Sequence, residues 1–215
     1  MTDKSAKTLA PSGPLPPAKQ RQILDGARQV FLDVGFERAC MDHIAARAEV
    51  SKATIYNHFH DKKELFLACI REHTRVKHEA LAALLGSPSG DVEQDLQRFG
   101  ETLMGFLTTR DGLALRRIIL ADISRFPELG RVLFEEGPIA LRHRLAAYLQ
   151  AQAGAGALRL EDAQLAAYQF ILLCQGDLYL PVEFGMVRDP PAERIQEAVR
   201  GAVRTFLRAY GPQPR

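Results

Sequence analysis

Apolar residues recur every three or four positions near the start of this sequence, which is the period of an amphipathic α-helix. One such stripe is formed by Ile23, Ala27, Val30, Phe31 and Val34. Gly35 follows it, where a helix commonly ends with a residue in the left-handed conformation. The pattern predicts a helix of about four turns that begins near Lys19.

A second and shorter stripe predicts another helix directly after the first. It is formed by Met41, Ile44, Ala45 and Ala48. Only residues 49–51 separate it from a further helical stretch, and Ser51 is a good N-cap for a helix that begins at Lys52. Two short helices joined by so tight a turn are typical of a helix-turn-helix motif.

The third helix has two different faces when its residues are placed on a helical wheel. Ile55 and Phe59 fall on the apolar face. The opposite face is small and polar, with Ala53 and Asn57 at its centre and Thr54 and Tyr56 beside them. We therefore expect one face to anchor the helix and the other to meet a partner.

The rest of the chain also reads as helical. Asp61 and Glu64 resemble a capping box at the start of a fourth helix, which we expect to continue to Leu85. Helical patterns follow over 91–110, 112–126, 127–150, 161–180 and 192–210, with a kink or restart at Pro138. No strand alternation and no internal repeat occurs. The fold class is therefore predicted to be all-α.

Residues 1–18 differ from everything that follows. They are rich in Ser, Lys, Ala and Pro and show no apolar periodicity, so they cannot bury enough surface to offset the entropy of ordering. We expect a disordered tail over 1–18, a helix-turn-helix domain over 19–66 and an all-helical domain over 67–215.

Composition changes this picture little. The net charge of +2 is too small to indicate a nucleic-acid partner by itself. No apolar run is long enough to span a membrane and no signal-peptide pattern occurs, so we expect a cytoplasmic protein. The three cysteines Cys40, Cys69 and Cys174 are far apart and form no CxxC pair, which argues against a disulfide framework and a structural zinc.

The stretch "VSKATIYNHFHDKKELF", residues 50–66, gathers the chemistry-bearing side chains of this region. His58 and His60 are two positions apart and cannot share a helix face, so we expect no metal site. Ser51 is used as a cap and no glycine-rich oxyanion loop is present, so we expect no catalytic residues, no enzyme activity and no cofactor. A DNA-binding surface and a solvated helix pair without a partner remain as alternatives.

Residues 21–66 closely resemble the N-terminal DNA-binding domain of the TetR family of transcriptional regulators. The resemblance rests on "DHIAARAEVS" for helix and turn, "KATIYNHF" for the recognition helix and "DKKELF" for the start of the fourth helix. It implies that a first group of side chains meets the major groove, namely Lys52, Ala53, Tyr56 and Asn57. It implies that a second group holds phosphates, namely Thr54, His58 and Lys62.

Two positions depart from the pattern of the family. Cys40 stands where a Thr or Ser commonly caps the second helix and touches phosphate, and His60 stands where Pro is frequent. The first departure predicts a missing cap and a lower affinity for DNA.

Base recognition of this kind sets a requirement for the whole chain. Asn57 can pair with adenine and Lys52 with guanine, each contact contributing about 1–3 kcal/mol of discrimination. One short helix reads few bases, so specificity requires two copies on a palindromic operator in double-stranded DNA. We therefore expect a homodimer.

The last two predicted helices carry stripes that fit a dimer seam, and in the TetR family the corresponding helices form a four-helix bundle. The expected seam residues are Ala166, Gln169, Phe170 and Leu173 on one helix and Val199, Ala202, Val203 and Phe206 on the other. The alternative is that these stripes form the core of a single chain, which periodicity does not decide.

The stretch "LRRIILADISRFPELGRVLFEEGP", residues 115–138, resembles the C-terminal domain of the AefR-like subgroup of the TetR family. The resemblance implies an effector cavity among the fourth to eighth predicted helices, whose expected lining is Phe106, Ile123, Phe126, Phe134, Leu172, Gln175 and Tyr179. Plain core packing is the alternative for each residue taken singly.

These observations predict a homodimeric repressor that leaves its operator when a small, largely apolar effector binds. The alternative is an effector-blind DNA organiser, or an adaptor for a protein partner, built on the same fold.

Overall fold

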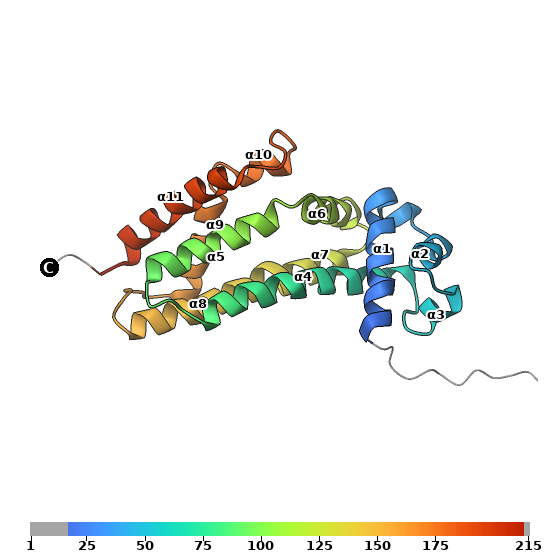
Figure 1. Cartoon of the computed structure of the whole chain (residues 1–215), viewed down its shortest axis with the longest axis horizontal. Coiled ribbons are helices and arrows are strands. Elements are labelled where there is room, and N and C mark those ends of the chain that lie inside the picture. The colour runs from blue at the N-terminus through green and yellow to red at the C-terminus, as the bar shows by residue number, and fades with distance from the viewer. Residues whose placement is uncertain (1–16, 213–215) are drawn as a thin grey trace, which may run out of the picture. The chain divides into compact units, whose positions relative to one another are not determined.

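The structure is a computed structural model that describes residues 17–212 (Figure 1). Over these residues it is helical throughout and contains no strand, which confirms the all-α prediction. The elements are α1 (Pro17–Arg38), α2 (Met41–Arg47), α3 (Lys52–Tyr56), α4 (Lys62–Gly86), α5 (Val92–Leu107), α6 (Arg110–Asp122), α7 (Pro127–Phe134), the π-helical turn η1 (Glu135–Ile139), α8 (Ala140–Gly154), α9 (Ala163–Gln175), α10 (Tyr179–Glu183) and α11 (Ala192–Tyr210).

Most of the tail expected over 1–18 lies outside the described residues. Its last two residues do not belong to a tail, because α1 already begins at Pro17. Proline suits the first position of a helix, where the backbone N–H has no partner within the helix.

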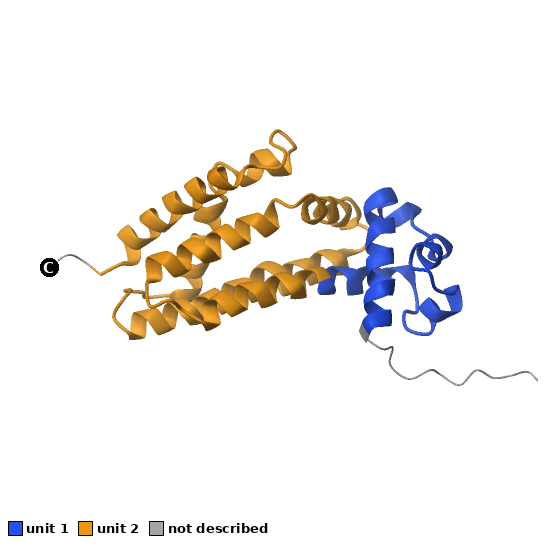
Figure 2. Ribbon diagram, in the orientation of Figure 1, with its two compact units in different colours: residues 1–72 blue, residues 73–215 orange. Residues whose placement is uncertain are grey.

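The chain divides into two compact units, Met1–Glu72 and His73–Arg215 (Figure 2). The division falls inside α4, so this helix contributes residues to both units. Unit 1 contains the helix-turn-helix and unit 2 contains the later helices.

The core of unit 1 is aromatic at its centre. The ring centroid of Phe66 lies 4.6 Å from that of Phe31 and 5.1 Å from that of Phe36. Regular helix geometry in α1 ends at Gly35, whose φ of 79° is left-handed. The turn after this residue returns Phe36 to the core, where it is almost fully buried.

A glycine in α1 sets how closely this helix approaches the helix-turn-helix. A Cβ atom at Gly26 would lie 2.7 Å from the Ala48 Cβ and 2.8 Å from the Ala48 backbone nitrogen. On the neighbouring turn of α1, the Gln22 side chain donates a hydrogen bond of 2.8 Å to the Ala48 carbonyl. Only a residue without a side chain allows this close contact.

The caps of α2, α3 and α4 follow the sequence prediction. Cys40 precedes α2 and makes no side-chain cap, whereas the Ser51 hydroxyl accepts from the Thr54 backbone N–H at 3.0 Å. At α4 the Asp61 carboxylate accepts from the Glu64 N–H at 2.7 Å. The Glu64 carboxylate in turn accepts from the His60 N–H at 2.6 Å.

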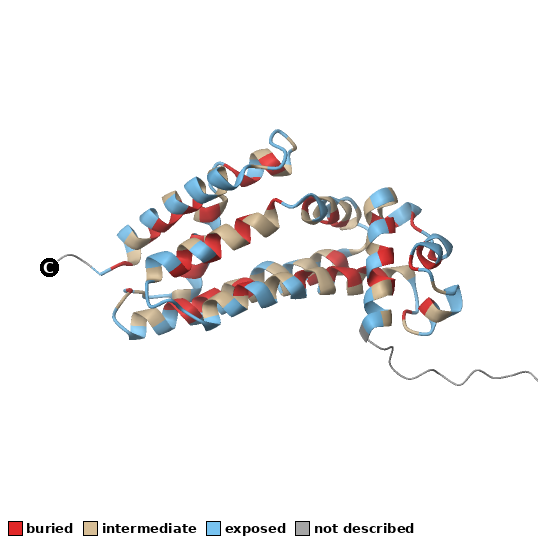
Figure 3. Ribbon diagram, viewed as in Figure 1, coloured by how far each residue is buried: buried red, intermediate tan, exposed pale blue. Residues whose placement is uncertain are grey.

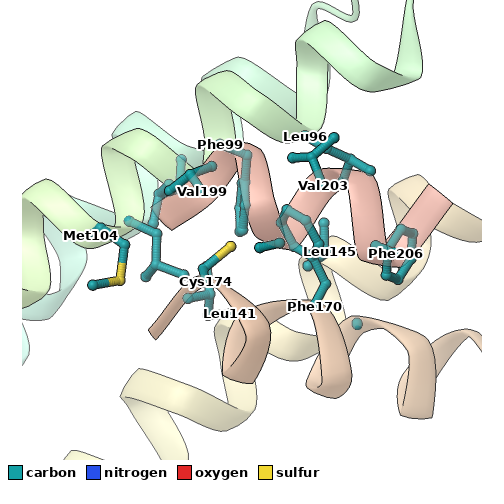
Figure 4. Packing of buried hydrophobic residues seen from close by; sticks show 14 of the residues in the cluster. Leu96, Phe99, Met104, Leu141, Leu145, Phe170, Cys174, Val199, Val203 and Phe206 are labelled. Atoms are coloured by element: carbon teal, nitrogen blue, oxygen red, sulfur yellow. The ribbon is translucent and has the colours of Figure 1, made fainter. Parts of the chain in front are cut away.

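Unit 2 is a bundle in which α9 contacts α8, α5 and α11, and α5 also contacts α11. Figure 3 shows that these helices bury one face and expose the other. Figure 4 shows their shared core, where Phe170 lies 6.3 Å from Phe99 and 5.2 Å from Phe206 between ring centroids. These three side chains come from α9, α5 and α11, so the core joins elements that are far apart in the sequence.

Two of the predicted helices are interrupted. The stretch 161–180 is not one long helix, because α9 ends at Gln175 and Gly176 follows with a φ of 42°. The chain restarts at α10 after this left-handed residue. Pro138 lies in the π-helical turn between α7 and α8, so the helix is irregular at the position where the sequence predicted a kink or a restart.

None of the helices in residues 17–212 combines the length and the apolar character needed to cross a membrane.

Candidate functional site

The exposed face of α3 is the first candidate site. Ile55 is completely buried and Phe59 is 6% exposed, so these two side chains anchor the segment in unit 1. All four residues predicted to meet a major groove are exposed, namely Lys52, Ala53, Tyr56 and Asn57. The structure therefore brings them together on one surface.

The helix itself is shorter than the sequence suggested. It ends at Tyr56, so Asn57 is its C-cap and His58 lies in the following turn. The backbone N–H groups of Asn57 and His58 still bond to carbonyls of the preceding turn, at 3.0 Å in both cases. These bonds fix the backbone at Asn57 although it lies past the end of the helix.

Lys52 already has a partner within unit 1. Its ammonium forms an ion pair of 2.9 Å with the Asp42 carboxylate of α2. The hydrogen bond to Asp42 raises the pKa of Lys52 above its ordinary value. Both side chains are exposed, so water competes with the pair and Lys52 can exchange Asp42 for another hydrogen-bond acceptor.

The three residues predicted to hold phosphates are half-buried. The Thr54 hydroxyl lies 2.7 Å from the Ser51 hydroxyl. The Lys62 ammonium donates to the Glu37 carbonyl at 2.9 Å and lies 4.6 Å from the centroid of the Phe36 ring. Lys62 therefore links the start of α4 to the end of α1, a contact that the sequence did not predict.

The turn between α2 and α3 contains a strained residue. Glu49 is exposed and has a φ of 51°, which is the left-handed region. A residue with a Cβ adopts this region at an energetic cost. This conformation could not be predicted from the sequence, because glycine is the residue that usually indicates such a position.

No group of three or more His, Cys, Asp or Glu side chains within residues 17–212 is placed to hold a metal ion.

The second candidate site is a cavity of about 180 Å³ within unit 2. Its wall is mostly apolar and comes from helices between α4 and α10, including Leu81, Leu103, Leu113, Leu133, Leu141 and Ile171. Three residues of the predicted lining lie on this wall: Phe106, Gln175 and Tyr179.

The other four residues of the predicted lining do not line this cavity, so the prediction is wrong for them. Phe134 and Leu172 face solvent, with 59% and 45% of their surface exposed. Ile123 packs against Gly130 of α7, and Phe126 precedes α7 with the Arg125 guanidinium 5.1 Å from its ring centroid. The apolar periodicity identified the stripes on these helices, but it did not show which face of each helix lines the cavity.

The sequence prediction included the fourth helix in the cavity but named none of its residues, and α4 contributes Lys77 and His78 to the wall. The Lys77 ammonium donates to the Phe106 carbonyl at 3.3 Å. Burial lowers the pKa of Lys77 to about 8, with Asp111 acting in the opposite direction. Burial also lowers the pKa of His78, and the positive charges of Arg144 and Lys77 lower it further.

Arg116 is the other strong cation on this wall, and it is already neutralised. Its Nε lies 2.5 Å from the Glu183 carboxylate of α10. The hydroxyl of Tyr179 also donates to this carboxylate, at 3.5 Å. Together these contacts fasten α10 to α6 beside the cavity.

The predicted dimer seam is wrong for most of its residues. Six of them are buried in the core of unit 2, namely Ala166, Phe170, Val199, Ala202, Val203 and Phe206. Leu173 also packs against this core, and only Gln169 is exposed. These stripes are therefore core within one chain, which was the alternative interpretation.

The opposite face of α9 is apolar and exposed. Leu165, Tyr168 and Leu172 have 49%, 48% and 45% of their surface exposed. Their spacing of three and four residues places them on one stripe. On α11, Thr205 is exposed and Gly201 is half-buried.

Both parts of the chain match known protein families. The family described as "Bacterial regulatory proteins, tetR family" matches residues 23–69. The family described as "AefR-like transcriptional repressor, C-terminal domain" matches residues 94–212.

Solved structures resemble nearly the whole chain. A TetR-family transcriptional regulator from Mesorhizobium loti is 26% identical with a TM-score of 0.85, over 91% of this chain and 98% of that one. The Flavonoid-responsive Regulator FrrA is 32% identical with a TM-score of 0.76, over 93% of this chain and 100% of that one.

Among curated proteins, the HTH-type transcriptional activator FasR of Mycolicibacterium smegmatis is 48% identical over 55 residues. The aligned stretch is 26% of this chain and spans only 25% of the length of that relative.

Proposed function

The chain belongs to the TetR family of bacterial transcriptional regulators, and from this premise we propose a homodimeric repressor that binds a palindromic operator and responds to a small effector. The observation that carries the proposal is the exposed face of α3 above the buried Ile55. This face presents the Lys52 ammonium and the Asn57 amide, which can hydrogen-bond to base edges in the major groove.

The base-reading part of the proposal rests on Asn57 and Lys52. The Asn57 amide presents one donor and one acceptor, which match the N7 and N6 edge of adenine. The Lys52 ammonium exchanges the Asp42 carboxylate, 2.9 Å away, for a guanine edge or a phosphate. Thr54, His58 and Lys62 flank this face and are proposed to contact phosphates, which fix the register of the helix without reading sequence.

Dimerisation is proposed through the exposed stripe of α9, because the residues first expected at a seam are buried in the chain. The stripe consists of Leu165, Tyr168 and Leu172. A second copy would remove these side chains from water, and Gly201 of α11 would allow a close approach between helices.

Effector binding is proposed for the cavity of unit 2. Its apolar wall and few polar groups are typical of small-molecule sites, and its volume of about 180 Å³ fits a small compound. FrrA is named as flavonoid-responsive, which supports a response to small molecules in proteins of this fold. An effector that binds one spacing of the two α3 helices better than another would shift the dimer away from DNA.

The proposal is tested by selecting duplexes from a random DNA library with the full chain. We expect enrichment of two inverted half-sites about one helical turn apart. Asn57→Ala should lose the preference at one position of each half-site, whereas Gln150→Ala, an exposed change in unit 2, should leave the selected sequence unchanged. Enrichment of a single half-site, or no enrichment, would refute the palindromic dimer.

A further inference from the structure

We propose that the cavity of unit 2 takes a small organic carboxylate, with the Lys77 ammonium as the partner of the carboxylate and the leucine-rich wall as the partner of the apolar body. The inference rests on the proposed function, because it names the chemical class of the effector. It follows from how charge and apolar surface are distributed around the cavity.

Lys77 brings a cation to a mostly apolar wall, where Asp111 attracts it electrostatically without forming an ion pair. Its ammonium donates to the Phe106 carbonyl at 3.3 Å and lies 5.9 Å from the centroid of the Phe106 ring. No ion pair joins it to an acidic residue among residues 17–212. An ammonium taken out of water is stabilised by an anion, so the site favours a negatively charged ligand.

The depressed pKa of Lys77 supports this assignment. Burial lowers the pKa to about 8, which still leaves most of the ammonium charged at neutral pH. A carboxylate that enters the cavity would restore a favourable environment for this charge.

The other basic groups of the wall are less suited to hold an anion. Arg116 is paired with Glu183 at 2.5 Å, so its charge is already compensated. The pKa of His78 is lowered, which makes it a neutral hydrogen-bonding group at pH 7. Lys77 feels the charge of Asp111 but forms no ion pair with it, so its ammonium can still take a carboxylate partner from a ligand, whereas the charge of Arg116 is already paired.

The sequence also sets Lys77 apart. It is the only lysine beyond Lys63, and every other strong cation in residues 73–215 is an arginine. Lysine tolerates partial burial by a shift of its pKa and binds as a compact point charge, whereas arginine keeps its charge in all conditions.

The apolar wall decides what the rest of the ligand must be. Inorganic phosphate or a sugar would lose water without gaining contacts with Leu81, Leu103 or Leu141. An apolar cavity of about 150 Å³ accepts a benzene ring, and the volume here is about 180 Å³. The fitting class is therefore a monocarboxylic acid with one ring or a short chain.

The test compares acids with their uncharged amides on the full-length protein. The probes are benzoate with benzamide and hexanoate with hexanamide, titrated by calorimetry at pH 7. We expect the acid of at least one pair to bind about tenfold tighter than its amide, because a hydrogen bond between two charged groups is stronger than one to a neutral group. Equal affinity within both pairs, or no binding of any probe up to about 10 mM, would overturn the proposal.

Variants assign the preference to one side chain. Lys77→Met should abolish the difference between acid and amide while the amide still binds, and Lys77→Arg should retain it. Arg131→Met removes an exposed cation of α7 outside the cavity and should change neither affinity. A preference for the acid that persists in Lys77→Met would contradict the role of Lys77, provided that circular dichroism shows the variant to be folded.

DNA binding is read separately, by fluorescence anisotropy on the selected operator duplex. An acid that binds through Lys77 but leaves the DNA affinity unchanged would sustain the carboxylate site and overturn the effector response. An amide that releases DNA as well as its acid would sustain the effector response and overturn the carboxylate assignment.

Discussion

At the scale of single residues, the candidate DNA surface depends on a few side chains with separable tasks. Asn57 is exposed and offers an amide to a base edge, whereas Lys62 is half-buried and contacts Glu37 and Phe36. The first is proposed to read sequence and the second to hold phosphate. These two tasks predict different responses to substitution.

We expect Asn57→Ala to relax base preference at one position of each half-site, at a cost of about 1–3 kcal/mol on the preferred sequence. Lys62→Ala should instead weaken binding to all sequences alike and flatten the dependence of log K on log salt by about one unit. Binding isotherms at several salt concentrations separate the two. Equal losses on every duplex from both variants would contradict the assignment.

Glu49 gives a stability prediction at the same scale. Its φ of 51° is strained for a residue with a Cβ, so Glu49→Gly should raise the free energy of unfolding by about 0.5–1 kcal/mol. Glu49→Ala removes the same carboxylate but keeps the strain and should bring no such gain. Urea denaturation measures both, and equal gains would point to the side chain rather than to the backbone.

At the scale of elements, close contacts between helices position the surface and the core. Gly26 allows α1 to approach Ala48 at the end of α2. In unit 2, the Tyr148 hydroxyl of α8 donates to the Asp95 carboxylate of α5 at 2.9 Å, and both residues are buried. Each contact can be tested by one substitution.

Gly26→Ala should destabilise unit 1 by about 1–3 kcal/mol, because the new methyl group would overlap the Ala48 backbone. Gly105→Ala is the matched control. This glycine lies in α5, where a Cβ meets no atom within 4 Å, so alanine should stabilise by about 0.5–1 kcal/mol. Thermal denaturation followed by circular dichroism compares the two, and a loss at both sites would exclude the steric explanation.

The Asp95–Tyr148 contact predicts a dependence on pH. Burial by itself raises the pKa of Asp95, but the hydrogen bonds from Ser89 and Tyr148 outweigh it and hold the pKa below its ordinary value of 3.8. Because the folded pKa is depressed, this stabilisation is complete above pH 3.8 and is lost as pH falls through the folded pKa.

Tyr148→Phe should therefore cost about 1.5–3 kcal/mol at pH 7. The difference from the wild type should shrink as the pH falls below 3.8 and through the depressed pKa of Asp95, where the folded protein takes up a proton. Urea denaturation at a series of pH values checks this. A cost that is the same at acid and neutral pH would mean that the carboxylate is not the partner that matters.

The local features of the fold could be predicted from the sequence, whereas the choice between helix faces could not. Caps such as Ser51 depend on neighbours three residues away, and the apolar period of α1 is equally local. On α9, however, Phe170 faces the core and Leu172 faces solvent, although both are large and apolar. Which face packs inside depends on the neighbouring helices, and so do the cavity lining and the dimer seam.

At the scale of the whole molecule, the exposed apolar stripe of α9, formed by Leu165, Tyr168 and Leu172, is the surface proposed to pair two copies of the chain. Tyr168→Asp should therefore convert the protein to a monomer and weaken operator binding. The matched control is Leu120→Asp on α6, because both side chains have 48% of their surface exposed. Sedimentation velocity measures the change, and a dimer that survives Tyr168→Asp would place the seam elsewhere.

The three cysteines have unequal surroundings, and this has a practical consequence. Cys69 and Cys174 are buried, which raises the pKa of each thiol to about 12, while Cys40 is exposed beside α2. A maleimide fluorophore should consequently attach at Cys40 alone, one per subunit, on the unit that carries the helix-turn-helix. Energy transfer between the dyes on the two subunits of the proposed dimer would report the distance between their helix-turn-helix units. It could be measured with and without effector in an otherwise unaltered protein.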